Sequence, residues 1–175
     1  MMEIIDLYDK DRKPLNKTAI KYNPLKSGEY QIIVHTCLFN DLGQMLIQKR
    51  GLDKIDWPNK WDISSGGGVM SGETSPNAAQ RELYEELGVK INLENERPYF
   101  TVHYPKGFDD YYLVDCSLDI NDFTYDGNEV IDIKWASLSE IKNMIKNDEF
   151  IKYNEGFIDL LFSMKNNRGT YPKGE

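Results

Sequence analysis

The sequence predicts an α+β fold in which helices cover a mixed β-sheet. Strand-like segments, a helical segment, further strands and two final helical segments follow one another along the chain, an order that indicates layered packing. The 175 residues, 40% of them hydrophobic and 29% charged, suit one globular domain with a sizeable core. We therefore expect residues 1–175 to form a single domain.

The first half of the chain contains runs of β-branched and aromatic residues that are separated by turn residues. The most strand-like run is YQIIVHTCLF at 30–39, which we expect to be buried. The run at 45–50 then returns as the second strand of a hairpin. The expected elements are strands at 2–8, 30–39, 45–50 and about 61–64, turns at 9–13 and 40–43, and a loop at 51–60.

A helix is expected from about Pro76 to Leu87. Ser75 is a suitable N-cap, proline is favoured in the first turn, and Gly88 suits the left-handed residue that ends many helices. Apolar side chains repeat at a spacing of four and form a face that suits a core. These apolar residues are Ala79, Leu83 and Leu87.

The second half of the chain repeats this alternation of strands and helices. Ser137 and Glu140 have the spacing of a capping box, which predicts the start of a helix. The expected elements are strands at 98–104, 110–118 and 130–136, a helix that begins at Ser137, a last helix at about 154–165 and an irregular tail.

Three glutamates gather on one face of the helix at 76–87. Glu82, Glu85 and Glu86 lie at positions i, i+3 and i+4. Their charges repel one another, and they lie toward the helix C-terminus, where the dipole disfavours negative charge. Mg²⁺ removes both penalties, since it takes oxygen ligands and binds substrate phosphates. The alternative is an acidic face that is simply solvated.

The segment 67–89, GGVMSGETSPNAAQRELYEELGV, resembles the Nudix box, the signature of enzymes that hydrolyse diphosphates linked to another moiety. Seven positions of the pattern demand one residue type, so a chance match is on the order of one in 10⁸ or rarer per start position. The matching residues are Gly67, Glu73, Arg81, Glu82, Leu83, Glu85, Glu86, Gly88 and Val89.

The resemblance implies a Nudix-type α/β/α sandwich. The box at 67–89 would follow an N-terminal extension at 1–29, and C-terminal helices would occupy about 137–165. The resemblance also implies a bound Mg²⁺, for which Mn²⁺ can substitute. The roles that it implies are metal binding by the Gly67 carbonyl and by Glu82, Glu85 and Glu86, base catalysis by Glu82 or Glu85, and structural support by Glu73, Arg81 and Gly88.

Basic and aromatic residues near the box are candidates for substrate contacts. Lys49 and Arg50 end the strand at 45–50, where basic residues of the family often touch phosphates; a solvated strand end is the alternative. Trp57 is a candidate for stacking on a base, whereas core packing is the expected place of Trp61. For His35 we expect a core or sheet-face position, and His103 is a candidate for the cleft.

Over residues 2–165 the chain is similar to the isopentenyl-diphosphate-isomerase-like branch of the superfamily. Isomerases of this branch place a cysteine and a metal-binding histidine on either side of the box glycine, where this chain has Gly66 and Gly68. A second metal histidine of the isomerases aligns with Gln31. Asp110 aligns roughly with an acidic residue that isomerases use for proton transfer, so we hold it as a reserve base.

The net charge is −8 and the pI about 4.9. This charge argues against a nucleic acid polymer or an anionic membrane as a partner, and a small diphosphate is expected instead.

No stretch has the length of a transmembrane helix, and the N-terminus does not resemble a targeting peptide. Cys37 and Cys116 are expected as buried free thiols of a cytoplasmic protein, for which the resemblance makes a homodimer an open possibility.

The expected activity is therefore Mg²⁺-dependent hydrolysis of a diphosphate bond in a nucleoside diphosphate or a related nucleoside-diphosphate-linked substrate. Two alternatives remain open. One is isomerisation of a prenyl diphosphate, which Gly66, Gly68 and Gln31 disfavour. The other is a non-catalytic sensor of a nucleotide derivative, which the complete set of box glutamates disfavours.

Overall fold

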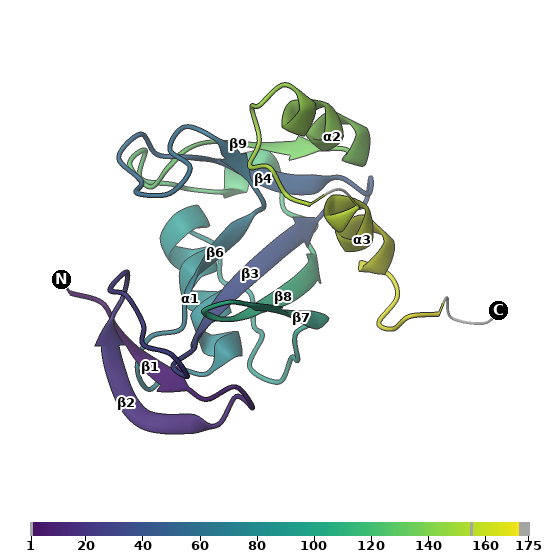
Figure 1. Cartoon of the computed structure of the whole chain (residues 1–175). Helices are drawn as coiled ribbons and strands as arrows, with labels where there is room; N and C mark the ends of the chain where they lie inside the picture. The colour runs from purple at the N-terminus through teal and green to yellow at the C-terminus, as the bar shows by residue number, and fades with distance from the viewer. Residues whose placement is uncertain (1, 155, 172–175) are drawn as a thin grey trace.

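The computed structural model describes residues 2–154 and 156–171 (Figure 1). Its elements follow the predicted alternation of strands and helices. In chain order they are β1 (Ile4–Tyr8), β2 (Pro14–Ile20), β3 (Gln31–Phe39), β4 (Met45–Arg50), β5 (Trp61–Asp62), β6 (Ser65–Gly68), α1 (Ser75–Leu87), β7 (Phe100–Tyr104), β8 (Gly107–Asp115), the 3₁₀ helix η1 (Ile120–Asp122), β9 (Val130–Ala136), α2 (Leu138–Lys146) and α3 (Phe157–Met164).

The main sheet is mixed, as predicted. β3 pairs in parallel with β8 along its whole length and antiparallel with β6 on its other edge. β7 continues the sheet beyond β8 in the antiparallel direction. β4 pairs with β5 and β9 and joins β3 only through Phe39 and Met45. β3 therefore brings the glycine strand β6 and the acidic strand β8 to its two sides.

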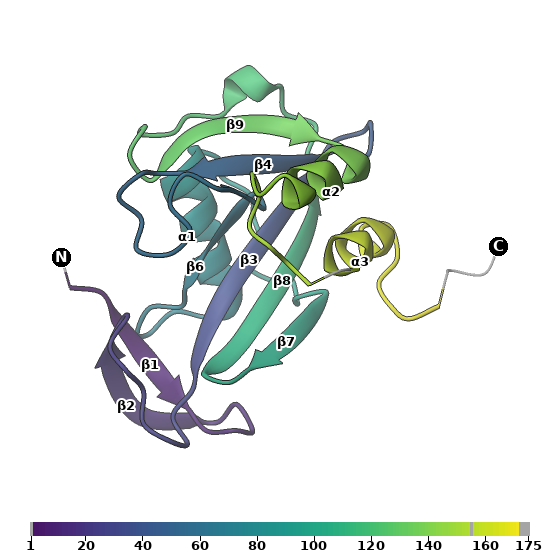
Figure 2. The ribbon, with the colours of Figure 1, turned by 45° about the horizontal axis from the view of Figure 1, so that its top comes forward.

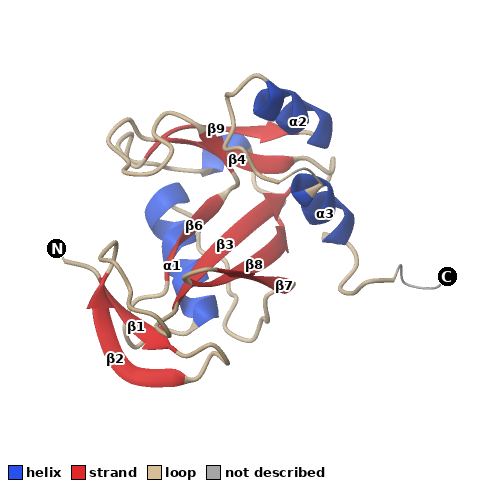
Figure 3. Cartoon of the chain, in the orientation of Figure 1, coloured by secondary structure: helices blue, strands red, loops and turns tan. Residues whose placement is uncertain are grey.

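Helices cover both faces of this sheet (Figures 1 and 2). Side chains alternate along β3 and β8, so each strand contributes to two cores. Val34 and Tyr112 belong to the core under α1, and Cys37 and Leu113 belong to the core under α2 and α3. Figure 3 shows α1, α2 and α3 beside the strands. The chain thus has the predicted α+β, α/β/α sandwich.

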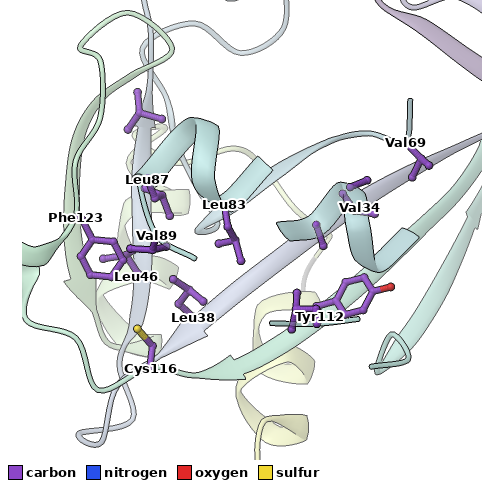
Figure 4. Packing of buried hydrophobic residues seen from close by; sticks show 14 of the residues in the cluster. Val34, Leu38, Leu46, Val69, Leu83, Leu87, Val89, Tyr112, Cys116 and Phe123 are labelled. Atoms are coloured by element: carbon purple, nitrogen blue, oxygen red, sulfur yellow. The ribbon is translucent and has the colours of Figure 1, made fainter. Parts of the chain in front are cut away.

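The apolar face of α1 packs against β3 and the segments that follow the helix. Leu83 and Leu87 are fully buried and belong to the same hydrophobic cluster as Val34, Leu38 and Val89 (Figure 4). Full burial of a leucine contributes about 1.5–3 kcal/mol. This packing holds the opposite, acidic face of the same helix in place.

The ends of α1 agree with the prediction except at the N-cap. Thr74 is the N-cap residue, and its side chain accepts a hydrogen bond from the Asn77 amide. The hydroxyl of Ser75 instead donates to Asp110, at 2.5 Å. Gly88 ends the helix with φ 70°, and its N–H donates to the Tyr84 carbonyl. The left-handed conformation there favours glycine.

The N-terminal extension differs from the prediction, because it forms a hairpin rather than one strand. β2 pairs antiparallel with β1, and Tyr8 bridges to Tyr30 at the start of the main sheet. Of the predicted strand at 61–64 only Trp61–Asp62 forms a strand, β5, and a separate strand, β6, begins at Ser65. The capping box of Ser137 and Glu140 at the start of α2 is confirmed.

Two further features concern the environment of the chain. Cys37 and Cys116 are buried and free, as predicted. Among residues 2–154 and 156–171, no helix combines the length and the apolar character needed to cross a membrane.

Candidate active site

A cleft of about 800 Å³ opens where β3, β6 and β8 approach the C-terminal half of α1. Residues from the end of the N-terminal hairpin, the loop after β4 and the segment before α3 complete its walls. All three helix glutamates line it, together with the glycines of β6. The predicted metal residues and the glycine strand therefore share one cleft.

Glu82 and Glu86 are the buried carboxylates of this cleft, with 8% and 5% of their surface exposed. Oε2 of Glu86 accepts hydrogen bonds from Gln48 Nε2 and from the Gly66 amide, both at 3.1 Å. These donors come from β4 and β6, so two strands fix the position of one helix side chain.

Burial changes the acidity of both carboxyl groups. Burial and the nearby charge of Glu82 raise the pKa of Glu86 to about 7. Burial also raises the pKa of Glu82, although the Arg81 guanidinium opposes this shift. Two neighbouring carboxylates with incompletely compensated charge favour a cation at this place.

Gly67 lies directly against Glu82. A Cβ atom added to Gly67 would overlap Oε1, Cδ and Oε2 of the Glu82 carboxylate. A side chain at position 67 would therefore force the Glu82 carboxylate to move. This is a physical reason for the first glycine of the box.

Arg81 is the centre of a network that connects the box residues. Its Nε donates to Glu73 Oε1 at 2.8 Å, and its Nη1 donates to Glu82 Oε1 at 2.7 Å and to Glu85 Oε2 at 2.9 Å. Its Nη2 donates to the Gly68 carbonyl at 2.9 Å. Although burial opposes the charged form, these carboxylates hold the pKa of Arg81 well above its ordinary value. Arg81 therefore orients acidic side chains, as the sequence indicated.

Glu85 differs from its two neighbours. Its side chain is 56% exposed, and Arg81 Nη1, which also binds Glu82, pairs with it at 2.9 Å. Among the described residues, no group of three or more His, Cys, Asp or Glu side chains is already spaced to hold a metal ion. The three glutamates that were predicted to bind the metal thus lie in one cleft. The carboxylate of Glu85, however, is engaged in an ion pair with Arg81.

The two predicted basic residues lie at different places. Arg50 lines the cleft, where it donates to the Asp56 carbonyl from Nε at 3.1 Å and pairs with Asp62 at 3.4 Å. Lys49 is not among the described residues that line the cleft. Neighbouring residues of a strand point to opposite faces, so β4 can present only one of the two.

Lys21 is a basic residue of the cleft that the sequence analysis did not identify. Its Nζ pairs with Glu3 at 2.5 Å, and its charge opposes the rise in the pKa of Glu82 that burial causes. Its side chain also lies against Gly68, since a Cβ there would meet Lys21 Cε at 3.4 Å. A single lysine in the N-terminal extension gives no sequence signal, because only the fold of the hairpin brings it to the cleft.

The position of Asp110 does not support its interpretation as a reserve base. It is fully buried on the face of β8 that packs toward α1. Arg12 binds its two carboxylate oxygens, and Thr101 and Ser75 also donate to it. The neighbouring Asp109 is the acidic residue of β8 that lines the cleft.

The remaining candidates divide between core, sheet face and surface. His35 lies on the sheet face and lines the cleft, stacked on Tyr111 at 4.6 Å between ring centroids. His103 packs edge-on against Phe108 and is not among the described cleft residues, contrary to the expectation. Trp61 is buried as predicted, whereas Trp57 is about half exposed at the rim of the cleft.

Comparison with known proteins decides the family. The model of the NUDIX domain matches residues 29–155. An uncharacterized Nudix hydrolase of Listeria innocua is 42% identical over 165 residues, which cover 94% of this chain and 96% of that protein. This chain belongs to the Nudix family. It is therefore a Nudix hydrolase, as the box indicated.

Solved structures show the same Nudix fold. A protein of Deinococcus radiodurans has a TM-score of 0.73 at 24% identity, covering 91% of this chain and 97% of that one. A bifunctional NMN adenylyltransferase/ADP ribose pyrophosphatase of Francisella tularensis, complexed with AMP and a Mn ion, has a TM-score of 0.61 at 20% identity, covering 84% of this chain and 44% of that one. The isomerase-like branch within the family stays a prediction.

Proposed function

We propose that this Nudix hydrolase cleaves, with Mg²⁺, a diphosphate bond in a nucleoside diphosphate or in a related nucleoside-diphosphate-linked substrate. The observation that carries the proposal is the pair of buried carboxylates, Glu82 and Glu86, which face one cleft beside the glycine strand. Arg81 compensates only part of this charge, since the pKa values of both acids stay raised, and a cationic ligand would compensate the rest.

The residues present fit a divalent cation by their donor chemistry. Glu82, Glu86 and the Gly67 carbonyl offer oxygen ligands, and Glu85 can join them if it leaves Arg81. When bound, Mg²⁺ or Mn²⁺ neutralises phosphate oxygens and makes a water molecule more acidic. The raised pKa of Glu86 and its contact with Glu82 are consistent with a site that such an ion completes.

The side chains of the cleft then have separate tasks. Glu82 or Glu85 accepts a proton from the attacking water, and the raised pKa of Glu82 brings it closer to the range suited to a general base. Lys21 and Arg50 supply positive charge for the phosphates. Arg81 holds Glu82, Glu85 and Glu73 and does not itself need to touch the substrate.

The choice of a nucleotide as substrate rests on the cleft and on a structural relative. The cleft of about 800 Å³ is large enough for a nucleotide derivative. Trp57 at its rim offers a surface for a base. The Francisella tularensis relative is described as an ADP ribose pyrophosphatase complexed with AMP.

Location and assembly complete the proposal. Two buried free thiols among the described residues suit the reducing environment of the cytoplasm. Association as a homodimer stays a prediction, which light scattering coupled to gel filtration tests directly.

The isomerase alternative has less support in the site. The isomerase cysteine and histidine positions are Gly66 and Gly68, which carry no side chain. Gln31, at the second histidine position, donates from Nε2 to the Tyr104 hydroxyl at 2.9 Å. These residues supply neither a thiol nor an imidazole, so we expect no proton exchange into isopentenyl or dimethylallyl diphosphate.

A product screen tests the proposed function. Purified protein with Mg²⁺ is incubated with nucleoside diphosphates, dinucleotides, nucleotide sugars and prenyl diphosphates. Release of phosphate or of a nucleoside monophosphate from a nucleotide supports the proposal. Prenyl isomerisation seen by NMR, or binding of nucleotides without any turnover, would favour the isomerase or the sensor instead.

A further inference from the structure

Asp109 is an acidic residue of the cleft for which the proposed chemistry has no task. It lies on β8 opposite Ile33 of β3, and Ile33 in turn pairs with Gly68 of β6. Its side chain lines the cleft and is 20% exposed. It therefore faces the ligand space from the strand opposite the glycine strand.

The Asp109 carboxylate lacks a donor. Its Oδ1 atom is buried without a hydrogen-bond partner among the described residues. Nε2 of His35 lies 3.6 Å away, which is beyond a hydrogen bond. An ionised carboxylate only accepts hydrogen bonds, and buried acceptors of native proteins are almost always satisfied. Oδ1 is closed to solvent, so the exposed part of the carboxylate, which has no hydrogen-bond donor among the described residues, is where a ligand in the cleft can bring one.

His35 holds a fixed position between Asp109 and the glycine strand. Its ring stacks on Tyr111 with an interplanar angle of 13°. On the other side, its Nδ1 would lie only 2.9 Å from a Cβ atom on Gly66. The imidazole thus occupies the space on β3 between Gly66 of β6 and Tyr111 of β8. Asp109 faces the cleft next to it.

The charge and position of Asp109 indicate which group of a substrate can donate a hydrogen bond to it. A carboxylate repels phosphate, so the diphosphate belongs near Lys21, Arg50 and the helix glutamates with their cation. Neighbouring strands are about 4.8 Å apart, so the Asp109 backbone is about 10 Å from β6 across β3. In a nucleoside diphosphate, the first neutral donors beyond the diphosphate are the ribose hydroxyls. The base lies one ring farther away.

We propose that Asp109 is a specificity-determining residue that accepts a hydrogen bond from a ribose hydroxyl of the substrate, with His35 as its positioning residue. This inference rests on the proposed function and adds the recognition of the sugar to it. A site that is built to bind a hydroxyl rejects an analogue that lacks it, because the acceptor is then left unpaired. The enzyme should therefore prefer ribonucleotides over deoxyribonucleotides.

The test compares kcat/KM for the best nucleotide of the screen with those for its 2′-deoxy and 3′-deoxy analogues. In the wild type, removal of the bound hydroxyl should lower kcat/KM by about tenfold or more. In Asp109→Ala, which removes the acceptor, the ratio of ribo to deoxy substrate should fall toward one, mainly through KM of the ribonucleotide. Asp115→Ala is the matched control, since Asp115 is exposed on the same strand and outside the described cleft lining.

The kinetic results that would overturn the inference are distinct. A purely structural role of Asp109 would lower kcat/KM for ribo and deoxy substrates alike and leave their ratio unchanged, which overturns the inference. Equal turnover of ribo and both deoxy substrates by the wild type overturns it without any variant. If no nucleotide is hydrolysed at all, the proposed function fails and this inference fails with it.

Discussion

Gly67 and Glu82 are in such close contact that no side chain fits between them. Any Cβ atom on Gly67 would overlap the Glu82 carboxylate. The glycine strand β6 and the helix α1 are therefore fitted to each other at the point where the cation is proposed to bind. This contact makes the geometry of the site sensitive to a single methyl group.

Gly67→Ala should displace the Glu82 carboxylate without removing it. We expect kcat to fall by about tenfold or more, because the electrostatic groups of an active site are effective only when they are preorganised. The stabilisation by Mg²⁺ should shrink in parallel. Steady-state kinetics and thermal melts with and without Mg²⁺ measure both. Wild-type kcat in the alanine variant would show that the contact does not matter.

The ion pair of Arg12 and Asp110 should act on stability and not on chemistry. Asp110 is fully buried, and Arg12 comes from the turn between β1 and β2, with φ 61°. Breaking a buried pair costs about 3–5 kcal/mol, since one charge is left uncompensated. Asp110→Asn should therefore lower the free energy of unfolding in urea by this order, with kcat of the folded protein nearly unchanged.

Lys10→Ala is the control for this prediction, because Lys10 and Asp11 form an exposed pair in the same turn. It should not change the stability measurably. A large loss of kcat in Asp110→Asn, with the urea midpoint preserved, would instead restore Asp110 as a candidate base.

Asp109 and Asp110 show which part of the site could not be predicted from the sequence. The run FDDYYLVD predicts a strand, but both faces of β8 are buried, so alternation gives no clue to which aspartate faces the cleft. The resemblance indicated Asp110 as a reserve base, whereas the fold places Asp109 in the cleft lining. Arg12 could not be assigned either, since its contact depends on a hairpin whose second strand was not predicted.

The box residues were predictable because they lie on one helix with fixed periodicity. The shared face of Glu82 and Glu86, the core face with Leu83 and the helix end at Gly88 all follow from spacing alone. The N-cap was displaced by one residue, because Thr74 and Ser75 are both competent caps and Ser75 is engaged by Asp110. The place of Glu85 depends on Arg81, which spacing does not reveal.

Stability of the metal-free protein should depend on pH through Glu86. Its pKa rises from an ordinary 4.5 to about 7 on folding, through burial first and the charge of Glu82 second. Between these values the folded protein binds more protons than the unfolded chain, so this contribution is complete below about pH 4.5 and is lost as the pH rises through 7. The shift corresponds to about 3 kcal/mol.

Urea unfolding in EDTA at pH 5 and pH 8 measures this contribution. Glu86→Gln should be more stable than the wild type at pH 8 and close to it at pH 5. Carboxyl groups whose pKa is lowered and that do not touch Glu86, such as Glu73, act in the opposite direction in both proteins and cancel in the comparison. The same difference between the two proteins at both pH values would contradict the raised pKa of Glu86.

Mg²⁺ should stabilise the folded protein by linkage. A cation that binds the folded site and not the unfolded chain adds roughly 1–3 kcal/mol at tens to a hundred times its Kd. The Tm should rise with Mg²⁺ or Mn²⁺, and the rise should shrink in Glu82→Gln and Glu86→Gln. NaCl at matched ionic strength controls for screening. If NaCl has the same effect as Mg²⁺, the acidic face is only solvated.

The central claim is that the buried glutamates of α1 form the catalytic metal site, and kcat of Glu86→Gln at saturating Mg²⁺ tests it most directly. The variant keeps the shape of the side chain but removes its charge. Glu94→Gln, an exposed glutamate outside the described cleft lining, is the control. We expect kcat to be lower by about two orders of magnitude or more in Glu86→Gln, with a cooperative melt, and a wild-type rate in the control. A kcat within a few-fold of wild type in Glu86→Gln would contradict it.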